Sequence, residues 1–158
     1  MKQFNNLYIF CDGGARGNPG PSAIGFLIKD NKGKILVQKG KYIGRATNNV
    51  AEYQGVIHAL RWLIENNLTM KQFNPGKTED PRLKHRDNEA IDFYLDSQLV
   101  VNQLNGLWKI KDAKLRSLVI QVKALENEIK ASIIYQHIPR EKNKEADKLV
   151  NRAIDAHS

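Results

Sequence analysis

The spacing of apolar residues changes once along this chain of 158 residues, and that change restricts the possible folds more than any other feature. Three short runs rich in β-branched and aromatic residues come first, at residues 7–11, 22–29 and 35–43. From residue 49 to residue 67 the apolar side chains instead recur at helical spacing along one face. We therefore predict three consecutive strands followed by a long helix.

Strand and helix patterns alternate through the rest of the chain. Residues 90–96 and 132–136 read as strands, and residues 97–104, 113–127 and 142–155 read as helices. The turn sequence "DNKGK" at 30–34 predicts that the first three strands form an antiparallel meander. Alternation of strands with helices favours parallel pairing thereafter, so we predict an α/β fold: a mixed five-stranded sheet with helices packed on both faces.

Composition favours one domain, spanning residues 1–158. Apolar residues make up 41% of the chain, which suits a single core, and we see no linker or separate binding domain. No apolar run approaches the roughly 18 residues of a membrane span, and the amino end lacks the features of a signal peptide. We therefore expect a soluble, cytoplasmic monomer without a membrane partner. Its only cysteine, Cys11, excludes an internal disulfide and a cysteine-rich zinc site.

The net charge of +8 favours a polyanionic partner, and it is spread over both halves of the chain, which indicates a basic surface more than a basic arm. The segment "IFCDGGARGNPGPSAIGF" at 9–26 could approach such a partner. Because Pro19 and Pro21 prevent a helix after the glycines, it is neither a P-loop nor a dinucleotide fingerprint. We predict a non-helical loop whose backbone amides approach a ligand, with Arg16 available for phosphate. An ordinary wide turn is the alternative.

Four acids occur at element boundaries, where a site can be built. They end the first strand, lie in the first turn of the long helix, end the fourth strand and lie early in the last helix: Asp12, Glu52, Asp96 and Asp147. If the first and fourth strands are neighbours, the two helices can present their acids at the same place. Gathered carboxylates repel one another unless cations hold them, so the pattern predicts a site for two hard divalent ions such as Mg²⁺ or Mn²⁺. Taken singly, each acid is more typical of a solvated surface.

Four motifs in the same order make the chain resemble a type 1 ribonuclease H. They are "DGGARGNPGP" at 12–21, "TNNVAEY" at 47–53, "YLDSQLVV" at 94–101 and "HIPREKNKEAD" at 137–147. The resemblance implies the ribonuclease H-like fold and endonucleolytic cleavage of the RNA strand of an RNA/DNA hybrid. It also implies that the four acids hold two Mg²⁺ ions, which activate the attacking water and stabilise the departing 3′ oxygen, leaving 5′-phosphate and 3′-hydroxyl ends.

The same resemblance assigns further roles. Three amides match positions that contact the minor groove, where the ribose 2′-hydroxyl distinguishes RNA from DNA: Asn18, Asn48 and Gln98. The glycines Gly13 and Gly14 belong to the same substrate-binding set. Arg45 and Thr47 match positions that bind a phosphate of the DNA strand in some members of the family. Thr47 is also a typical helix N-cap. The catalytic histidine of the family, which helps product or proton departure, matches His137.

Two departures from the best-known bacterial pattern concern substrate binding. No lysine-rich helical handle separates "GLWKIKD" at 106–112 from the helix near residue 113; Trp108 and nearby lysines could replace it in part, or Trp108 could be a core residue. An extension occupies residues 68–89, and we expect it to leave the fold away from the acids. Two other functions stay open: a non-catalytic hybrid-binding module, or another nuclease of the same broad fold.

Overall fold

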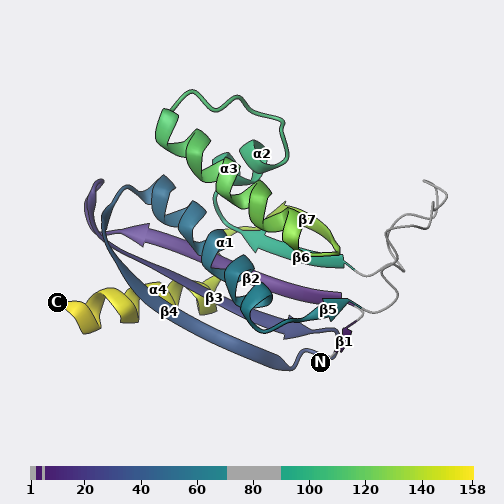
Figure 1. Cartoon of the computed structure of the whole chain (residues 1–158). Coiled ribbons are helices and arrows are strands. Elements are labelled where there is room, and N and C mark those ends of the chain that lie inside the picture. Colours follow the sequence, from purple (N-terminus) through teal and green to yellow (C-terminus); the bar gives the residue numbers. More distant parts are fainter. Residues whose placement is uncertain (1–2, 5, 71–89) are drawn as a thin grey trace.

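A mixed five-stranded sheet forms the centre of the protein, as predicted. The computed structural model describes residues 3–4, 6–70 and 90–158, and its main sheet has the strand order β4-β3-β2-β6-β7 (Figure 1). The strands are β2 (Asn6–Ala15), β3 (Gly20–Asp30), β4 (Ile35–Ala46), β6 (Ala90–Leu95) and β7 (Ser132–His137). The first three of them pair antiparallel, whereas β2, β6 and β7 run parallel. A separate two-stranded parallel sheet, β1 (Gln3–Phe4) with β5 (Thr69–Met70), has no counterpart in the sequence predictions.

The register between β2 and β6 aligns two of the acids. These strands are parallel neighbours, and Phe10 is paired with Tyr94. Asp12 and Asp96 each follow that pair by two residues. Because side chains alternate between the two faces of a strand, both carboxylates lie on the same face and at the same end of the sheet.

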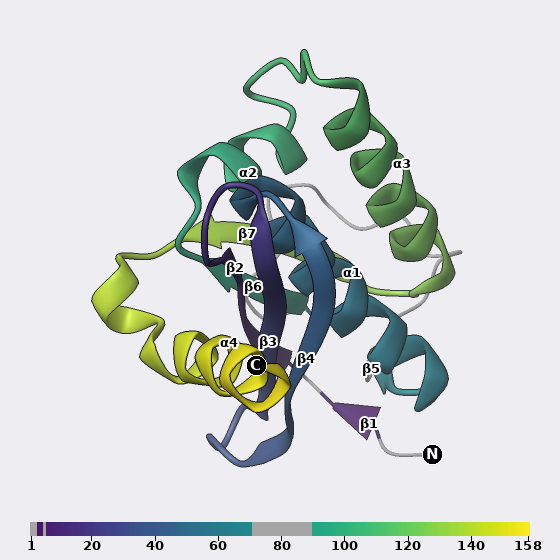
Figure 2. The ribbon, with the colours of Figure 1, turned by 90° about the vertical axis from the view of Figure 1, so that its left-hand side faces the viewer.

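The helices cover both faces of the sheet (Figures 1 and 2). On one face α1 (Asn48–Glu65) packs on β2 and β3, with α2 (Gln98–Leu104) and α3 (Ala113–Glu128) beside it. On the other face α4 (Lys144–His157) packs on β3, β4 and β2. The main core lies between α1 and the sheet, where Tyr53, Ile57 and Leu60 are fully buried. Burial of each such side chain contributes about 1.5–3 kcal/mol, so α1 is firmly anchored.

Strand β2 is longer than predicted, because Gly13 and Gly14 belong to the strand and not to a loop. A β-carbon on Gly13 would lie 2.1 Å from the carbonyl oxygen of Ala51 in α1. The missing side chain therefore allows β2 and the start of α1 to approach closely. The irregular segment is confined to residues 16–19, where Gly17 has a positive φ of 95°.

The last helix begins later than predicted. A short 3₁₀ turn at Arg140–Lys142 precedes α4, which starts at Lys144 instead of residue 142. The chain is extended at Pro139, and the backbone N–H of Asn143 donates to the carbonyl oxygen of Arg140. This turn brings Asn143 into contact with Cys11 of β2 and with Asp96, just after β6, before the helix starts.

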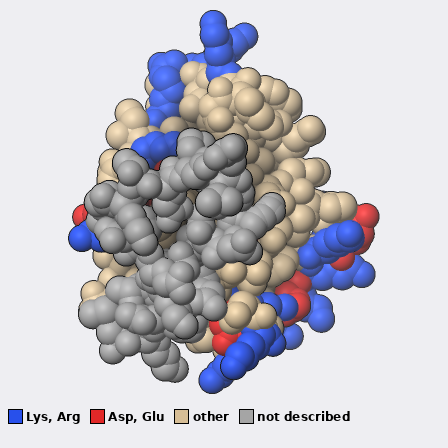
Figure 3. Space-filling model, turned by 90° about the vertical axis from the view of Figure 1, so that its right-hand side faces the viewer, with Lys and Arg blue, Asp and Glu red and all other residues tan. Residues whose placement is uncertain are grey.

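The extension at 68–89 is described only as far as Met70, so its predicted position relative to the acids lies outside the described residues. Within the ranges that the structure describes, no helix is both long and apolar enough to cross a membrane. Lysine and arginine side chains occur at several separate places on the face drawn in Figure 3, not in a single patch. That distribution agrees with a basic surface.

Candidate active site

Three of the four predicted acids meet at one end of the sheet. Asp12 in β2 and Glu52 in α1 are 7% and 6% exposed, and Asp96 directly after β6 is half-buried. One carboxylate oxygen from each lies within 4.8 Å of the others. Glu52 lies in the second turn of α1, one turn later than predicted, because the helix begins at Asn48.

The fourth acid, Asp147, lies in the first turn of α4 and is half-buried. It does not belong to the group of three whose oxygens lie within 4.8 Å of one another. Its charge nevertheless contributes to raising the pKa of Asp12, so it lies beside the group. The structure thus brings together Asp12, Glu52 and Asp96, with Asp147 at their border.

Burial and mutual repulsion raise the pKa of two of these carboxyl groups, Asp12 and Glu52. Burial raises the pKa of Asp12 from 3.8 to about 7, and the charges of Asp96 and Asp147 add to this effect. The pKa of Glu52 is also raised, first by burial and then by the charge of Asp12. Among the described residues, no ion pair involves Asp12, Glu52 or Asp96. The described part of the chain therefore places no cationic side chain in contact with these three carboxyl groups.

The donors present suit a hard divalent cation. All are carboxylate oxygens, the ligands that Mg²⁺ and Ca²⁺ prefer. Glu52 Oε2 is buried and has no hydrogen-bond partner, which is costly unless a ligand contacts it. The Gly13 N–H donates to Asp12 Oδ1 at 2.9 Å and to Glu52 Oε1 at 3.4 Å. The backbone thus orients one carboxylate oxygen of Asp12 and one of Glu52. We conclude that these three acids could hold a divalent metal.

Two of the predicted substrate-binding amides are linked to each other. The backbone N–H of Asn48 donates to Asn18 Oδ1 at 2.9 Å, and the N–H of Ala15 donates to Asn48 Oδ1 at 2.9 Å. Both asparagines are exposed, so their NH₂ groups remain accessible. Thr47 caps α1 by accepting from the N–H of Val50 at 3.2 Å, as predicted for an N-cap.

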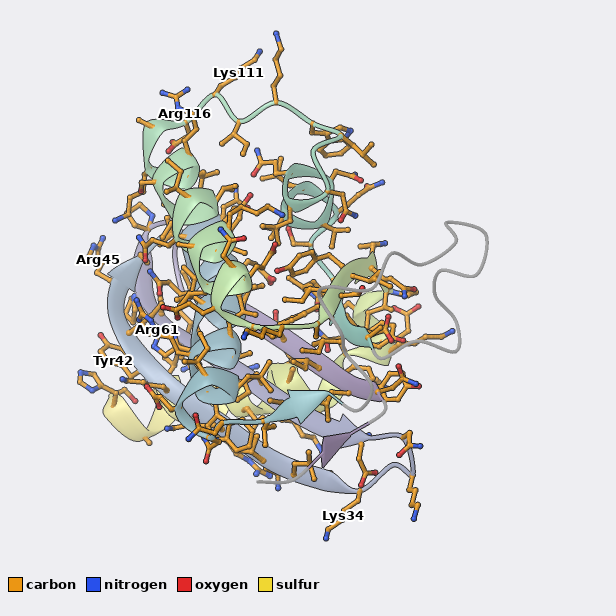
Figure 4. The ribbon with its side chains drawn as sticks, turned by 45° about the vertical axis from the view of Figure 1, so that its right-hand side comes forward. Lys34, Tyr42, Arg45, Arg61, Lys111 and Arg116 are labelled. Carbon is orange, nitrogen blue, oxygen red and sulfur yellow. The ribbon has the colours of Figure 1, made fainter. Side chains whose placement is uncertain are left out.

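The predicted cationic contacts occupy different places. Arg16 forms an ion pair at 2.6 Å with Asp155 of α4, and it also donates to Asn151 Oδ1 at 3.2 Å, so it is already engaged within the protein. Arg45 is exposed and projects from the end of β4 (Figure 4). It lines a groove of about 570 Å³ together with Thr47, Lys41 and Lys114, and none of the described residues that line this groove is acidic. Such a lining favours an anion.

The two remaining predicted residues, His137 and Gln98, lie near Asp96, one through strand pairing and one through the chain. His137 is the last residue of β7 and is exposed, and Leu95, just before Asp96, is its partner in β6. Gln98 is the first residue of α2, is exposed, and follows Asp96 by two residues. Both therefore lie at the same end of the sheet as the acidic group.

Known proteins share this fold. The family model of RNase H matches residues 5–155, almost the whole chain. The chain belongs to the RNase H family. Its structure resembles the crystal structure of RNase H1 from the halophilic archaeon Halobacterium salinarum, with 34% identity and a TM-score of 0.78 over 96% of this chain and 98% of that one.

Two further members of the family are similar over the same region. LC11-RNase H1, solved in complex with an RNA/DNA hybrid, is 38% identical with a TM-score of 0.77, covering 96% of this chain and 98% of that one. The bifunctional protein Rv2228c of Mycobacterium tuberculosis is 38% identical over 151 residues, which is 95% of this chain but 36% of that protein. The chain thus spans about a third of the length of the mycobacterial relatives.

Sequence reasoning missed one residue that contacts the acidic group, Asn143. The predicted helix at 142–155 contains Asn143 as its second residue, a position that gives no signal of a contact with the acids. In the structure its side chain makes no capping bond; it is 1% exposed and donates to Asp96 Oδ2 at 3.1 Å. Sequence reasoning also left Trp108 open, and the structure places it on the surface, 44% exposed, between α2 and α3.

Proposed function

We propose that this member of the RNase H family cleaves the RNA strand of RNA/DNA hybrids endonucleolytically, giving 5′-phosphate and 3′-hydroxyl ends. The observation that carries the proposal is the clustering of Asp12, Glu52 and Asp96, two of them buried, in a chain matched by the family from residue 5 to residue 155. The similarity to LC11-RNase H1, solved in complex with an RNA/DNA hybrid, supports the choice of substrate.

The acids would hold the metal cofactor. Asp12, Glu52 and Asp96 offer oxygens within 4.8 Å of one another, and Asp147 borders them, so we assign all four as ligands of two Mg²⁺ ions, with Mn²⁺ as a substitute. When bound, such ions supply the charge that activates the attacking water and stabilises the departing 3′ oxygen.

The other side chains would recognise the hybrid and move a proton. Exposed amide groups of Asn18, Asn48 and Gln98 can both donate to and accept from a ribose 2′-hydroxyl, which DNA lacks. Arg45, in a groove without acids, would bind a phosphate of the DNA strand, with Thr47 beside it. The exposed imidazole of His137 would carry a proton to the departing 3′ oxygen.

One cleavage assay tests this function. The RNA strand of a hybrid, single-stranded RNA and double-stranded DNA are each end-labelled and incubated with Mg²⁺, Mn²⁺ or EDTA. We expect cleavage only of the RNA in the hybrid, at internal positions, and only with a metal. Equal cleavage of duplex DNA would instead favour another nuclease of this fold. Tight hybrid binding without cleavage would favour a non-catalytic binding module.

The Asp12→Asn variant is the matched control for this assay, because it keeps the shape of the side chain and removes one charge. We expect turnover at moderate Mg²⁺ to be almost lost while the variant stays folded. A folded variant with a near-normal rate would remove Asp12 from the metal site. The cytoplasmic location and the monomeric state expected from the sequence remain predictions.

A further inference from the structure

One buried asparagine is hydrogen-bonded to Asp96, to Asp147 and to the residue that precedes Asp12. The Asn143 side chain donates through Nδ2 to the carbonyl oxygen of Cys11 at 2.8 Å and to Asp96 Oδ2 at 3.1 Å. Cys11 directly precedes Asp12 in β2. The main-chain carbonyl oxygen of Asn143 accepts a hydrogen bond from the backbone N–H of Asp147 at 3.1 Å. This bond begins the first turn of α4. Asn143 thus connects β2, the end of β6 and α4 at the acidic site.

The orientation of this amide is fixed by its partners. Both atoms that face Nδ2 are acceptors, a carbonyl oxygen and a carboxylate oxygen. A flipped amide would place Oδ1 against two acceptors, which is unfavourable. Because a carboxylate is planar, a bond to Oδ2 also restricts the direction of the second oxygen of Asp96.

The other end of the amide has no partner. Asn143 is 1% exposed, and its Oδ1 is buried without any hydrogen bond. An unsatisfied buried oxygen costs about 1–3 kcal/mol, and a side chain that only capped the helix would have no need to bear that cost. Its cap position is in fact unused, since the side chain makes no bond to the first turn of α4.

We propose that Asn143 is a positioning residue for the metal site, which holds the Asp96 carboxylate in the orientation that binds the cation and keeps β2 and α4 in register with it. The amide is suited to this task because it supplies two donors without a charge. A lysine would neutralise the acid, whereas an aspartate would repel it. This inference rests on the proposed function.

Substitution Asn143→Leu tests the proposal, since it keeps the approximate volume and removes the donor. Mg²⁺ binding is measured by calorimetry without nucleic acid, and kcat and KM are then measured on the hybrid. We expect the dissociation constant for Mg²⁺ to rise about tenfold or more and kcat at moderate Mg²⁺ to fall in proportion, with KM for the hybrid changed less than about threefold. An unchanged Mg²⁺ affinity in a folded variant would overturn the proposal.

A matched control separates positioning from general destabilisation. Gln103 is also a buried amide, 6% exposed, and its Oε1 accepts the hydroxyl of Tyr53 at 2.6 Å in the core. We expect Gln103→Leu to lower stability while leaving the Mg²⁺ dissociation constant within about twofold of its original value. Equal losses of Mg²⁺ affinity in Gln103→Leu and Asn143→Leu would refute a specific role for Asn143.

A measurement on the unmodified protein remains decisive if the variant fails to fold. In ¹⁵N-labelled protein, the side-chain NH₂ signals of Asn143 should be protected from exchange and should shift when Mg²⁺ is added. The NH₂ signals of Gln103 should stay in place. Absence of any shift at Asn143 under saturating Mg²⁺ would overturn the proposal, even if the protein cleaves hybrids and its proposed function stands.

Discussion

Replacing Asp12 by asparagine should stabilise the metal-free protein at alkaline pH. Burial and the neighbouring acids raise the pKa of Asp12 from 3.8 to about 7. Each tenfold change in proton affinity corresponds to ~1.4 kcal/mol. Keeping this group ionised in the folded protein therefore costs about 4 kcal/mol once the pH is well above 7. Asparagine has no charge, and its oxygen can still accept the Gly13 N–H.

The sign of the pH dependence follows from the direction of this shift. Because the pKa of Asp12 is higher in the folded state, the folded protein binds the proton more tightly than the unfolded chain does. The contribution of Asp12 to stability is therefore complete below about pH 4 and is lost as the pH rises towards 7. The advantage of Asp12→Asn should be negligible at pH 4 and should reach about 2–4 kcal/mol at pH 8.

Urea unfolding followed by circular dichroism in EDTA, at pH 4 and pH 8, measures this difference. A common m-value would show that the variant and the original protein expose the same surface on unfolding. The exposed acid Glu128, at the end of α3, supplies the control: Glu128→Gln should change stability by less than about 0.5 kcal/mol at either pH. A variant at Asp12 that is less stable than the original protein at pH 8 would refute this account.

Metal should reverse the effect. A cation that binds only the folded state stabilises it by an amount that grows with its concentration. The unmodified protein should therefore gain more stability from Mg²⁺ at pH 8 than Asp12→Asn does. If both proteins gain equally, Asp12 is not a ligand. If neither gains, the acidic group does not bind Mg²⁺ in the folded protein.

Three other predictions concern separate parts of the molecule. His137→Ala should lower kcat on the hybrid by on the order of 10²-fold without abolishing it, and complete loss in a folded variant would give His137 a larger role. Gly13→Ala should lower the free energy of unfolding by about 1–3 kcal/mol or more, because the added β-carbon would collide with α1. Gly14→Ala, whose β-carbon would lie 3.5 Å from a valine methyl, should change it by less than about 1 kcal/mol. Equal effects of the two substitutions in urea unfolding would contradict this. Arg45→Gln should raise KM for the hybrid several-fold and lower the slope of log binding constant against log salt concentration by about one. Lys34→Gln, at the other end of β4 (Figure 4), should change neither quantity.

Local patterns in the sequence were sufficient to predict the elements and their order. The helical spacing of apolar residues predicted α1 and α3 to within two residues at each end, and "DNKGK" predicted the turn between β3 and β4. These signals are local because a helix repeats every 3.6 residues and a strand every two. The motifs around Asp12, Glu52 and Asp96 likewise marked the acids that the structure brings together.

Only the tertiary structure decided how the site is built. The continuation of β2 through Gly13 depends on its contact with Ala51, and the bond from Asn143 to Asp96 joins residues 47 positions apart. The raised pKa of Asp12 arises from burial and from acids on other elements. Such interactions depend on distances between segments that are remote in the chain, and packing of the whole domain sets those distances. For this reason an asparagine that the sequence places inside the last predicted helix lies, in the folded protein, against the carboxylate of Asp96.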